Sequence, residues 1–548
     1  MHSHPPATFN FAQHLLGINA GRADKVAYID DAGGLTYGEL ADRVRRLAGG
    51  LRELWVRREE RVLVFMQDTN DWPVVFLGAL YAGVVPVAVN TLLTAGDCAY
   101  MLEHSRAQAA FVSAPLLPTL QAAMKQAAYD VPTVIVSGGG PAAGGVDLAR
   151  LLARSAPLGA PVATAADEAG FWLYSSGSTG QPKATVHTHA NLYWTAELYG
   201  KPVLGLREDD LCFSAAKLFF AYGLGNALTF PLSVGATVLL MAERPTPDAV
   251  FKRWIEHKPT VFYGAPTGYA GMLASANLPA REQVALRLCS SAAEPLPRRI
   301  GERFTQHFGC EIIDGLGSTE MLHIFLSNRP GDVRYGTSGK PVDGYRVELR
   351  DDHGRVITAA NEIGELFVAG PSAALMYWGN RLKSRDTFQG NWTRTADKYL
   401  RDPDGYYLYT GRNDDMLKVS GQYVSPFEVE AALVEHPSVL EAAVIGISDR
   451  DGLTRPKAFV VLRPPQQASD SLADELKLFV KGRLAPYKYP RLIEFLPELP
   501  KSATGKLLRS KLREREARLA SEQDEVGPSQ PIAGGSRAVP ASNPDGLK

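Results

Sequence analysis

Cysteine is scarce in this 548-residue sequence, and neither sign of charge is in excess. The four cysteines lie at positions 98, 212, 289 and 310 without any CxxC pair, which argues against a disulfide framework or a cysteine zinc site. We expect each cysteine to be a small buried apolar residue in a reduced, cytoplasmic protein. The formal net charge of −1 argues against general nucleic-acid binding, because that requires an excess of lysine and arginine.

Long hydrophobic runs are also missing. The most apolar stretch, residues 74–89, is shorter than the ~20 residues that span a bilayer and is interrupted by Gly83 and Pro86. It is typical of a buried helix followed by a buried strand. The N-terminus lacks a basic segment followed by an apolar run, so we expect neither a signal peptide nor a membrane partner.

What the sequence does contain is a recurring strand–helix–strand pattern. In the first unit a helix follows its cap, Asn70, and in a later unit a helix follows its cap, Thr246. The apolar face of the later helix consists of Val250, Phe251, Trp254 and Ile255. The expected strands of the two units are residues 61–66, 84–89, 235–241 and 260–266. Apolar strands that alternate with amphipathic helices predict α/β layers with mostly parallel pairing.

The pattern changes after about residue 340. Residues 344–370 alternate in polarity and turn on Gly and Asp, which predicts antiparallel hairpins. A compact α+β pattern follows, with helices expected at 426–435 and 472–484 and strands at 440–447, 456–463 and 491–496. We therefore predict a large N-terminal domain at 1–413, a small C-terminal domain at 414–517 and a disordered tail, rich in Gly, Pro and Ser, at 518–548.

The stretch "YSSGSTGQPK", residues 174–183, is too polar and too rich in glycine to build a core. We expect it to join a buried strand to a helix that covers residues 188–200. Glycines there would turn backbone N–H groups toward an anion, hydroxyl side chains would add donors, and Lys183 would add a charge suited to phosphate. Pro182 prevents a match to the P-loop pattern. Composition alone favours the alternative, a flexible surface turn.

Four further stretches carry polar residues of the same kind. "DGLGSTE", residues 314–320, ends in Thr319 and Glu320, a hydroxyl and a carboxylate suited to a magnesium ion that carries phosphates. Asp397 in "TRTADKY" could accept hydrogen bonds from ribose hydroxyls. Arg412 follows in "GRNDD", and Lys506 stands on a glycine-containing turn in "PKSATGKLLR".

Taken in this order, the five stretches resemble the adenylate-forming superfamily of acyl-CoA synthetases, luciferases and peptide-synthetase adenylation domains. The resemblance covers roughly residues 10–515, and residues 213–240 and 314–328 resemble benzoate–CoA ligases. It implies a large N-terminal domain of α/β layers with a β-rich portion, and a small mobile α+β C-terminal domain. It also implies two half-reactions: a carboxylate attacks the α-phosphate of ATP, and coenzyme A then displaces AMP.

The resemblance also assigns residues to roles. Thr179 and Lys183 would hold the β- and γ-phosphates, Glu320 and Thr179 would serve Mg²⁺, and Lys506 would reach the α-phosphate and the attacking carboxylate. The residues implied to bind the nucleotide are Ser175, Ser176, Gly177, Ser178, Gly180, Ala292, Ala293, Glu294, Asp314, Gly315, Leu316, Gly317, Ser318, Thr319, Asp397 and Arg412. Many relatives carry tyrosine in place of Leu316 and glycine in place of Ala396, which affects stacking under adenine and the ribose loop.

Because Lys183 and Lys506 fall in different domains, the resemblance implies that the small domain rotates between the half-reactions. Asp414 matches the hinge position, although a charged pair of aspartates such as 414–415 is also typical of a turn. Lys418 and Gly421 would then lie on the side of coenzyme A.

The acid pocket is expected where aromatic and small residues alternate, because a flat acid needs aromatic faces and a narrow slot. The residues implied to line it are Ala221, Tyr222, Gly223, Gly315, His323 and Ile324. Phe219 and Phe220 are more typical of plain core, and His323 has a structural alternative. His187 and His189 are expected at the start of a helix rather than in a metal site.

The leading hypothesis is a ligase that joins an aromatic acid, benzoate first, to coenzyme A with ATP and Mg²⁺. A hydroxybenzoate or aminobenzoate ligase is the nearest alternative, and pocket polarity discriminates between them. A light-emitting relative, a nucleotide-binding protein without turnover and a phosphotransferase that makes ADP are further alternatives. The oligomeric state stays open, a homodimer included.

Overall fold

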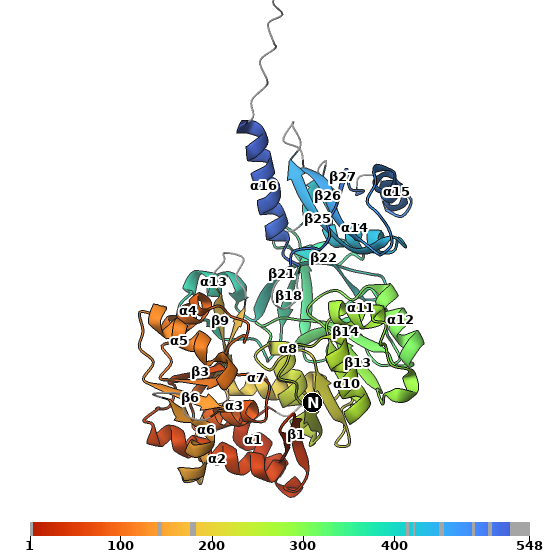
Figure 1. Ribbon diagram of the computed structural model, residues 1–548. Coiled ribbons are helices and arrows are strands. Elements are labelled where there is room, and N and C mark those ends of the chain that lie inside the picture. The colour runs from red at the N-terminus through yellow and green to blue at the C-terminus, as the bar shows by residue number, and fades with distance from the viewer. Residues whose placement is uncertain are drawn as a thin grey trace, which may run out of the picture. The chain divides into compact units, whose positions relative to one another are not determined.

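The computed structural model describes residues 4–139, 145–175, 182–412, 416–419, 422–448, 454–484, 488–501 and 507–525 (Figure 1). The chain separates into two compact units, Met1–Met416 and Leu417–Lys548. Our sequence analysis put the boundary after residue 413. The predicted α/β class, with a large N-terminal and a small C-terminal domain, is confirmed.

The first sheet of the large unit has eight strands in the order β19-β9-β8-β4-β3-β5-β6-β7. Neighbours from β8 to β7 along this order pair in parallel, whereas β9 is antiparallel to both β8 and β19. The strands are β3 (Arg61–Phe65), β4 (Val85–Ala88), β5 (Ala109–Ser113), β6 (Thr133–Ser137), β7 (Val146–Asp147), β8 (Ala169–Ser175), β9 (Lys183–Thr188) and β19 (Met376–Tyr377).

The predicted helix after the first strand is α3 (Asp71–Tyr81), but Asn70 does not cap it with its side chain. The backbone of Asn70 is already helical, with φ −54° and ψ −23°, so its side chain cannot reach back to the first turn. Its amide Nδ2 instead donates to the Gly33 carbonyl. Ten of the eleven residues of α3 are buried, which is why the sequence shows an apolar run rather than a stripe.

The second sheet of the large unit has nine strands in the order β16-β15-β14-β13-β12-β10-β11-β1-β2. Its centre, from β14 to β1, is parallel, and β15, β16 and β2 add antiparallel edges. The strands are β1 (Val26–Asp30), β2 (Gly33–Thr36), β10 (Leu211–Ser214), β11 (Thr237–Leu239), β12 (Val261–Gly264), β13 (Leu288–Ser291), β14 (Ile312–Gly317), β15 (Ile324–Ser327) and β16 (Lys340–Pro341).

Helix α10 (Pro247–His257) packs on this second sheet as predicted, with the Thr246 hydroxyl accepting from the Ala249 N–H. Three of the four predicted apolar residues are buried, but Ile255 is 42% exposed. Ile255 follows Trp254 directly, and a step of one residue turns the side chain about 100° around the helix and off the buried face.

The remaining helices of the large unit surround both sheets. They are α1 (Phe11–Ile18), α2 (Tyr37–Glu53), α4 (Ala95–Ser105), α5 (Leu117–Gln126), α6 (Leu148–Arg154), α7 (His189–Thr195), α8 (Ala221–Leu224), α9 (Phe230–Val234), α11 (Pro266–Ala274), α12 (Arg298–Phe308) and α13 (Arg381–Thr387). Two π-helical turns, η3 (Ala196–Gly200) and η4 (Gly225–Thr229), continue α7 and α8, so the predicted helix at 188–200 changes its geometry midway. Short 3-10 turns are η1 (Ala20–Arg22), η2 (Ala114–Leu116) and η5 (Arg281–Gln283).

The β-rich portion of the large unit is antiparallel, as predicted. Its sheet has the order β17-β18-β21-β20, with β22 paired to β21. The strands are β17 (Arg346–Arg350), β18 (Gly364–Ala369), β20 (Phe388–Gln389), β21 (Trp392–Arg401) and β22 (Tyr407–Arg412).

The small unit has the predicted α+β composition and its own apolar core, which includes Val429, Val444 and Leu476. Its elements are β23 (Leu417–Val419), β24 (Gln422–Val424), α14 (Pro426–Val434), β25 (Val439–Ser448), β26 (Thr454–Leu462), α15 (Asp470–Lys481), β27 (Leu492–Phe495) and α16 (Arg509–Glu525). Our prediction of a disordered tail from residue 518 is wrong for residues 518–525, which continue α16. Arg, Glu, Ala, Leu and Gln dominate this helix and favour helical backbone. Residues 526–548 lie outside the described residues.

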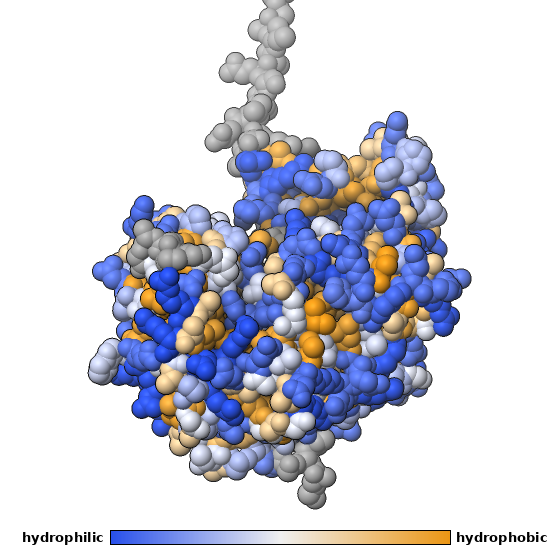
Figure 2. All heavy atoms as spheres, turned by 60° about the horizontal axis from the view of Figure 1, so that its bottom comes forward, coloured by the Kyte–Doolittle hydropathy of each residue, from blue (hydrophilic) through white to orange (hydrophobic). Residues whose placement is uncertain are grey.

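Most large apolar side chains are buried in the cores. The face seen in Figure 2 is mainly hydrophilic, with apolar residues among the hydrophilic ones. All four cysteines are buried and free, as expected. None of the described helices combines the length and the apolarity that a bilayer-spanning segment requires.

Candidate active site

The serine–glycine loop joins two antiparallel strands, not a strand and a helix as predicted. Strand β8 enters it and β9 leaves it, and Ser175 lies opposite Lys183 in their register. Alternating polarity and β-branched residues in "KATVHT" explain why the second element is a strand. The register fixes both ends of the loop. The loop itself, with the predicted residues Ser176, Gly177, Ser178, Thr179 and Gly180, lies outside the described residues.

Helix α4 holds both ends of this loop, a feature that our sequence analysis missed. The Tyr100 hydroxyl donates to the Pro182 carbonyl over 3.1 Å, and His104 Nδ1 lies 2.9 Å from the Tyr174 hydroxyl. Burial raises the pKa of Tyr174 and lowers that of His104, so both side chains are neutral hydrogen-bonding groups at physiological pH. Sequence reasoning had no means of finding these contacts, because they join segments about 70–80 residues apart.

The predicted residues Lys183 and Glu320 lie close together, although they are far apart in the chain. The Tyr377 hydroxyl donates to Glu320 Oε1 over 2.7 Å and accepts from Lys183 Nζ over 3.4 Å. The Lys183 ammonium also lies 4.4 Å from the centroid of the Tyr377 ring, at cation–π distance. One tyrosine therefore connects the end of the phosphate loop to the predicted magnesium carboxylate.

His187 forms a hydrogen bond to the segment that carries Thr319. His187 lies in β9 rather than in a helix, and its Nε2 donates to the Thr319 carbonyl over 2.8 Å. Burial lowers the pKa of His187 to about 4, so the imidazole is neutral at pH 7. His189 does begin α7, as expected. Neither histidine belongs to a metal cluster, and no three His, Cys, Asp or Glu side chains gather into one within the part of the chain that the structure describes.

The magnesium assignment does not require such a cluster. Mg²⁺ is commonly bound through one or two carboxylates, with phosphate oxygens and water completing its octahedron. A single carboxylate, Glu320, beside the phosphate-loop lysine fits that requirement.

The predicted acid pocket brings Tyr222 and His323 together. Their ring centroids are 5.6 Å apart, and His323 Nε2 donates to the Tyr222 carbonyl over 3.3 Å. The Tyr222 hydroxyl donates to Ser290 Oγ over 3.1 Å. Burial lowers the pKa of His323 to about 3, so it is neutral at physiological pH, and its Nδ1 has no hydrogen-bond partner among the described residues.

The small residues of this region serve close packing. A Cβ at Gly223 would collide with the Lys217 carbonyl, and a Cβ at Gly315 would lie 2.9 Å from the side chain of the buried Ile324. Gly225, which our sequence analysis did not select, leaves room for the His323 ring. Ala221 is half-buried beside Tyr222 at the start of α8.

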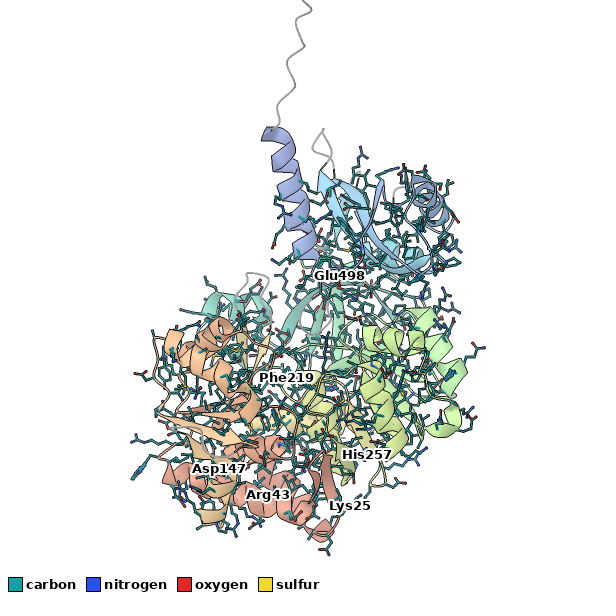
Figure 3. All side chains as sticks on the ribbon, in the orientation of Figure 1. Lys25, Arg43, Asp147, Phe219, His257 and Glu498 are labelled. Atoms are coloured by element: carbon teal, nitrogen blue, oxygen red, sulfur yellow. The ribbon has the colours of Figure 1, made fainter. Side chains whose placement is uncertain are left out.

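Phe219 belongs to the core, as our sequence analysis favoured. It is 5% exposed, its ring is tilted by 55° against that of Phe220 at 4.5 Å between ring centroids, and it lies in the interior of the large unit (Figure 3). Phe220 is partly buried against the same core.

The predicted adenine-side residues follow β13, or lie in β14 and directly after it. Ala292 is buried, Ala293 has a φ of +79°, and Glu294 accepts from the Thr267 N–H and hydroxyl. Asp314 is buried, and burial raises the pKa of its carboxyl well above the ordinary range. Leu316 and Gly317 end β14, and Leu316 packs against the main core. Ser318 follows, with its Oγ accepting from the Met321 N–H over 3.2 Å.

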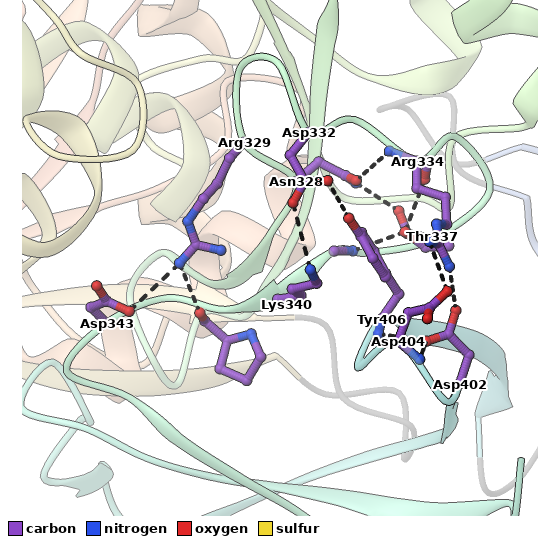
Figure 4. A network of polar contacts seen from close by, with 12 residues as sticks. Asn328, Arg329, Asp332, Arg334, Thr337, Lys340, Asp343, Asp402, Asp404 and Tyr406 are labelled. Carbon is purple, nitrogen blue, oxygen red and sulfur yellow. Dashed lines mark hydrogen bonds and ion pairs between the residues drawn. The ribbon is translucent and has the colours of Figure 1, made fainter. Parts of the chain in front are cut away.

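The predicted ribose residues Asp397 and Arg412 are cross-strand partners in the antiparallel backbone register of β21 and β22. This hairpin is braced by the network in Figure 4, where Arg334 donates to Asp402 over 2.7 Å and to Asp404 over 3.0 Å. The Arg334 guanidinium also lies 3.9 Å from the centroid of the Tyr406 ring. The network joins the β21–β22 hairpin to the segment that follows β15.

The predicted residues of the small unit can be placed only in part. Lys506, Asp414 and Gly421 lie outside the described residues, and Lys418 is described only by its backbone in β23. Their roles stay predictions.

With this geometry established, known proteins provide a comparison. Residues 18–378 match the family described as AMP-binding enzyme, and residues 428–506 match the AMP-binding enzyme C-terminal domain. The chain belongs to the AMP-binding enzyme family. This confirms the predicted adenylate-forming superfamily.

Three relatives in this family are very similar over nearly the whole chain. Benzoate–CoA ligase of Thauera aromatica is 57% identical over 511 residues, covering 93% of this chain and 96% of the relative. The 4-hydroxybenzoate–CoA/benzoate–CoA ligase of Rhodopseudomonas palustris is 49% identical, with 96% and 98% covered. The crystal structure of a benzoate CoA ligase from Burkholderia xenovorans LB400 superposes with a TM-score of 0.87 at 59% identity, covering 92% of this chain and all of that one.

Proposed function

We propose that this AMP-binding enzyme joins an aromatic carboxylic acid, with benzoate preferred, to coenzyme A, releasing AMP and pyrophosphate. The observation that carries the proposal is the 57% identity to a benzoate–CoA ligase across 93% of the chain. Identity at this level over both matched domains favours the same two half-reactions.

The chemistry explains why ATP is needed. A carboxylate is a poor acyl donor, because an oxide-like oxygen leaves badly. In the first half-reaction a carboxylate oxygen attacks the α-phosphorus, and the bond to the β-phosphate oxygen breaks to release pyrophosphate. In the second, the thiolate sulfur of coenzyme A attacks the acyl carbon, and the carbon–oxygen bond to AMP breaks.

In this proposal the side chains chiefly position anions and stabilise developing charge. Thr179 and Lys183 hold the β- and γ-phosphates, and Glu320 holds Mg²⁺, which neutralises phosphate charge. Asp397 and Arg412 hold the ribose, and Lys506 neutralises the α-phosphate and the incoming carboxylate.

The pocket chemistry supports benzoate as the preferred acid. The Tyr222 hydroxyl already donates to Ser290, and the imidazole of His323 is neutral, so no charged group faces the ring from these two residues. An unsubstituted ring brings no polar group that would itself need a partner in the slot.

One observation favours a second candidate, a hydroxybenzoate or aminobenzoate. Because His323 Nε2 carries the ring proton that it donates to the Tyr222 carbonyl, Nδ1 is an acceptor, and it has no partner among the described residues. A hydroxyl or amino substituent on the ring could donate to it. The relative from Rhodopseudomonas palustris is named for both 4-hydroxybenzoate and benzoate.

A pyrophosphate-release screen tests both candidates. We expect benzoate to give the highest kcat/KM among benzoate, the three hydroxybenzoates, 2-aminobenzoate, acetate and hexanoate, with AMP as the product nucleotide and a thioester only when coenzyme A is present. A higher kcat/KM for a substituted benzoate would select the second candidate. ADP as the product, a preference for alkyl acids, or no nucleotide turnover with any acid would contradict the proposal.

The cellular location and the binding partners of the protein are part of the same proposal. We place the enzyme in the cytoplasm without nucleic-acid or membrane partners, given its balanced charge and its free, buried cysteines. A homodimer and a hinge at Asp414 stay predictions.

A further inference from the structure

Tyr377 contacts both of the charged residues that the proposed function assigns to the triphosphate and to Mg²⁺. Its hydroxyl donates to Glu320 Oε1 over 2.7 Å and accepts from Lys183 Nζ over 3.4 Å. The three groups form a directed chain, ammonium to phenol to carboxylate. Our sequence analysis did not select Tyr377.

The sheet register explains how Tyr377 reaches Lys183. In the antiparallel pairing of β9 and β19, Tyr377 lies opposite Thr185, so their side chains share one face of the sheet. Lys183 lies two residues before Thr185 and points to the same face. Tyr377 and Lys183 are therefore diagonal neighbours, within reach of an aromatic ring and a long side chain.

The same short segment also holds Glu320 through the backbone. The Ala374 N–H donates to the Glu320 carbonyl over 2.8 Å, and the Tyr377 N–H donates to Ser384 Oγ over 3.0 Å. The backbone of Glu320 is thus bonded to the segment that leads into β19, and Tyr377 is itself bonded to α13, so the phenol meets the Glu320 carboxylate from a braced segment.

We propose that Tyr377 is a positioning residue for metal–nucleotide binding: its hydroxyl orients the Glu320 carboxylate toward Mg²⁺. The proposal rests on the roles that the proposed function gives to Lys183 and Glu320. Groups that orient a metal-binding carboxylate typically change metal affinity 10–100-fold when they are removed.

The phenol suits this task because one hydroxyl can donate to the carboxylate and accept from the ammonium at the same time. Without the hydroxyl, the carboxylate loses the donor that fixes its direction. Mg²⁺ would then meet a carboxylate that must first be ordered, whereas the phosphates would still find the Lys183 ammonium.

The test compares Tyr377→Phe with the wild type by titration of the full-length protein with ATP plus Mn²⁺, and with ATP plus EDTA, in the absence of any acid. We expect the affinity for Mn²⁺–ATP to fall about tenfold and the affinity for metal-free ATP to change less than twofold. Tyr37→Phe is the matched control, because it removes another buried tyrosine hydroxyl, which donates to the Ala236 carbonyl over 2.6 Å in the nine-stranded sheet. We expect the control to bind both forms like the wild type.

A double-mutant cycle separates positioning from general damage. If the tyrosine acts through the carboxylate, Tyr377→Phe adds almost nothing to the loss caused by Glu320→Gln. Equal affinities of Tyr377→Phe and the wild type for Mn²⁺–ATP, additive effects in the cycle, or equal losses with and without metal would overturn the proposal while leaving the ligase function intact. Absence of nucleotide binding by the wild type would instead overturn the proposed function.

Discussion

Ala396 adopts a left-handed backbone conformation, with a φ of +61°, directly before the predicted ribose residue Asp397. A Cβ in this region costs about 1–2 kcal/mol through contact with the following carbonyl oxygen, and glycine avoids that cost. The conformation gives a physical reason for the glycine that the family resemblance leads us to expect at this position. The fold tolerates alanine there because the β21–β22 ladder holds the residues on both sides.

At the residue scale we predict that Ala396→Gly stabilises the protein. The relief of left-handed strain exceeds the added chain entropy of glycine in the unfolded state, so the free energy of unfolding should rise by about 0.5–1 kcal/mol. Urea unfolding measures the change. The control is Ala360→Gly, because Ala360 is exposed and has no positive φ, and this change should destabilise slightly. Equal destabilisation by both substitutions would refute the argument.

At the scale of elements, the junction of β9 and α7 buries two neutral histidines. His187 donates to the Thr319 carbonyl, and His189 Nδ1 accepts from the Phe11 N–H over 3.3 Å. Burial lowers the pKa of each to about 4. In the unfolded chain both titrate near the ordinary value of about 6.5. The unfolded state therefore binds more protons than the folded state between about pH 6.5 and pH 4.

It follows that stability is lost as the pH falls through this window. Each histidine contributes up to about 1.4 kcal/mol per pH unit, so the pair lowers the free energy of unfolding by roughly 2–3 kcal/mol per unit at most. Chemical unfolding between pH 7.5 and pH 5 measures the slope. His189→Asn should flatten it, since an amide oxygen can accept from Phe11 without titrating, whereas the exposed control His353→Asn should leave it unchanged. An unaltered slope in His189→Asn would count against this explanation.

At the scale of the whole molecule, the two proposed phosphate-binding lysines belong to two separately packed units. Lys183 lies in β9 of the large unit, and Lys506 lies in the sequence of the small unit, which has its own core. The residue proposed for the β- and γ-phosphates and the residue proposed for the α-phosphate therefore lie in different units of one chain. Such a division lets one half-reaction depend on a group that the other does not need.

We predict that Lys506→Ala separates the half-reactions. Adenylate formation should slow by about 10²–10³-fold, because a cation is lost where charge develops in the transition state. Thioester formation from supplied benzoyl-adenylate should stay within a few-fold of the wild type. Rapid-quench measurements of pyrophosphate release and of benzoyl-CoA formation give the two rates separately, and equal losses in both would remove Lys506 from its assigned role.

The sequence by itself determined the layers, the antiparallel β-rich portion and the α+β small unit, because periodicity, caps and glycine-rich turns are local properties of the chain. The family came from the resemblance of five stretches to known enzymes. The sequence also brought Lys183, Glu320, Tyr222 and His323 into the candidate site. Two local errors, the missed strand β9 and the tail that we expected from residue 518, came from weighing turn residues above strand and helix propensity.

Only the tertiary structure decided which side chains meet. The contact of Tyr377 with Lys183 spans 194 residues, and that of His187 with Thr319 spans 132. Such contacts depend on strand register and on how sheets and loops pack, and a shift of one residue in register would turn each side chain to the opposite face. Local pattern cannot fix a register between strands that are distant in sequence, so these residues became visible only in the fold.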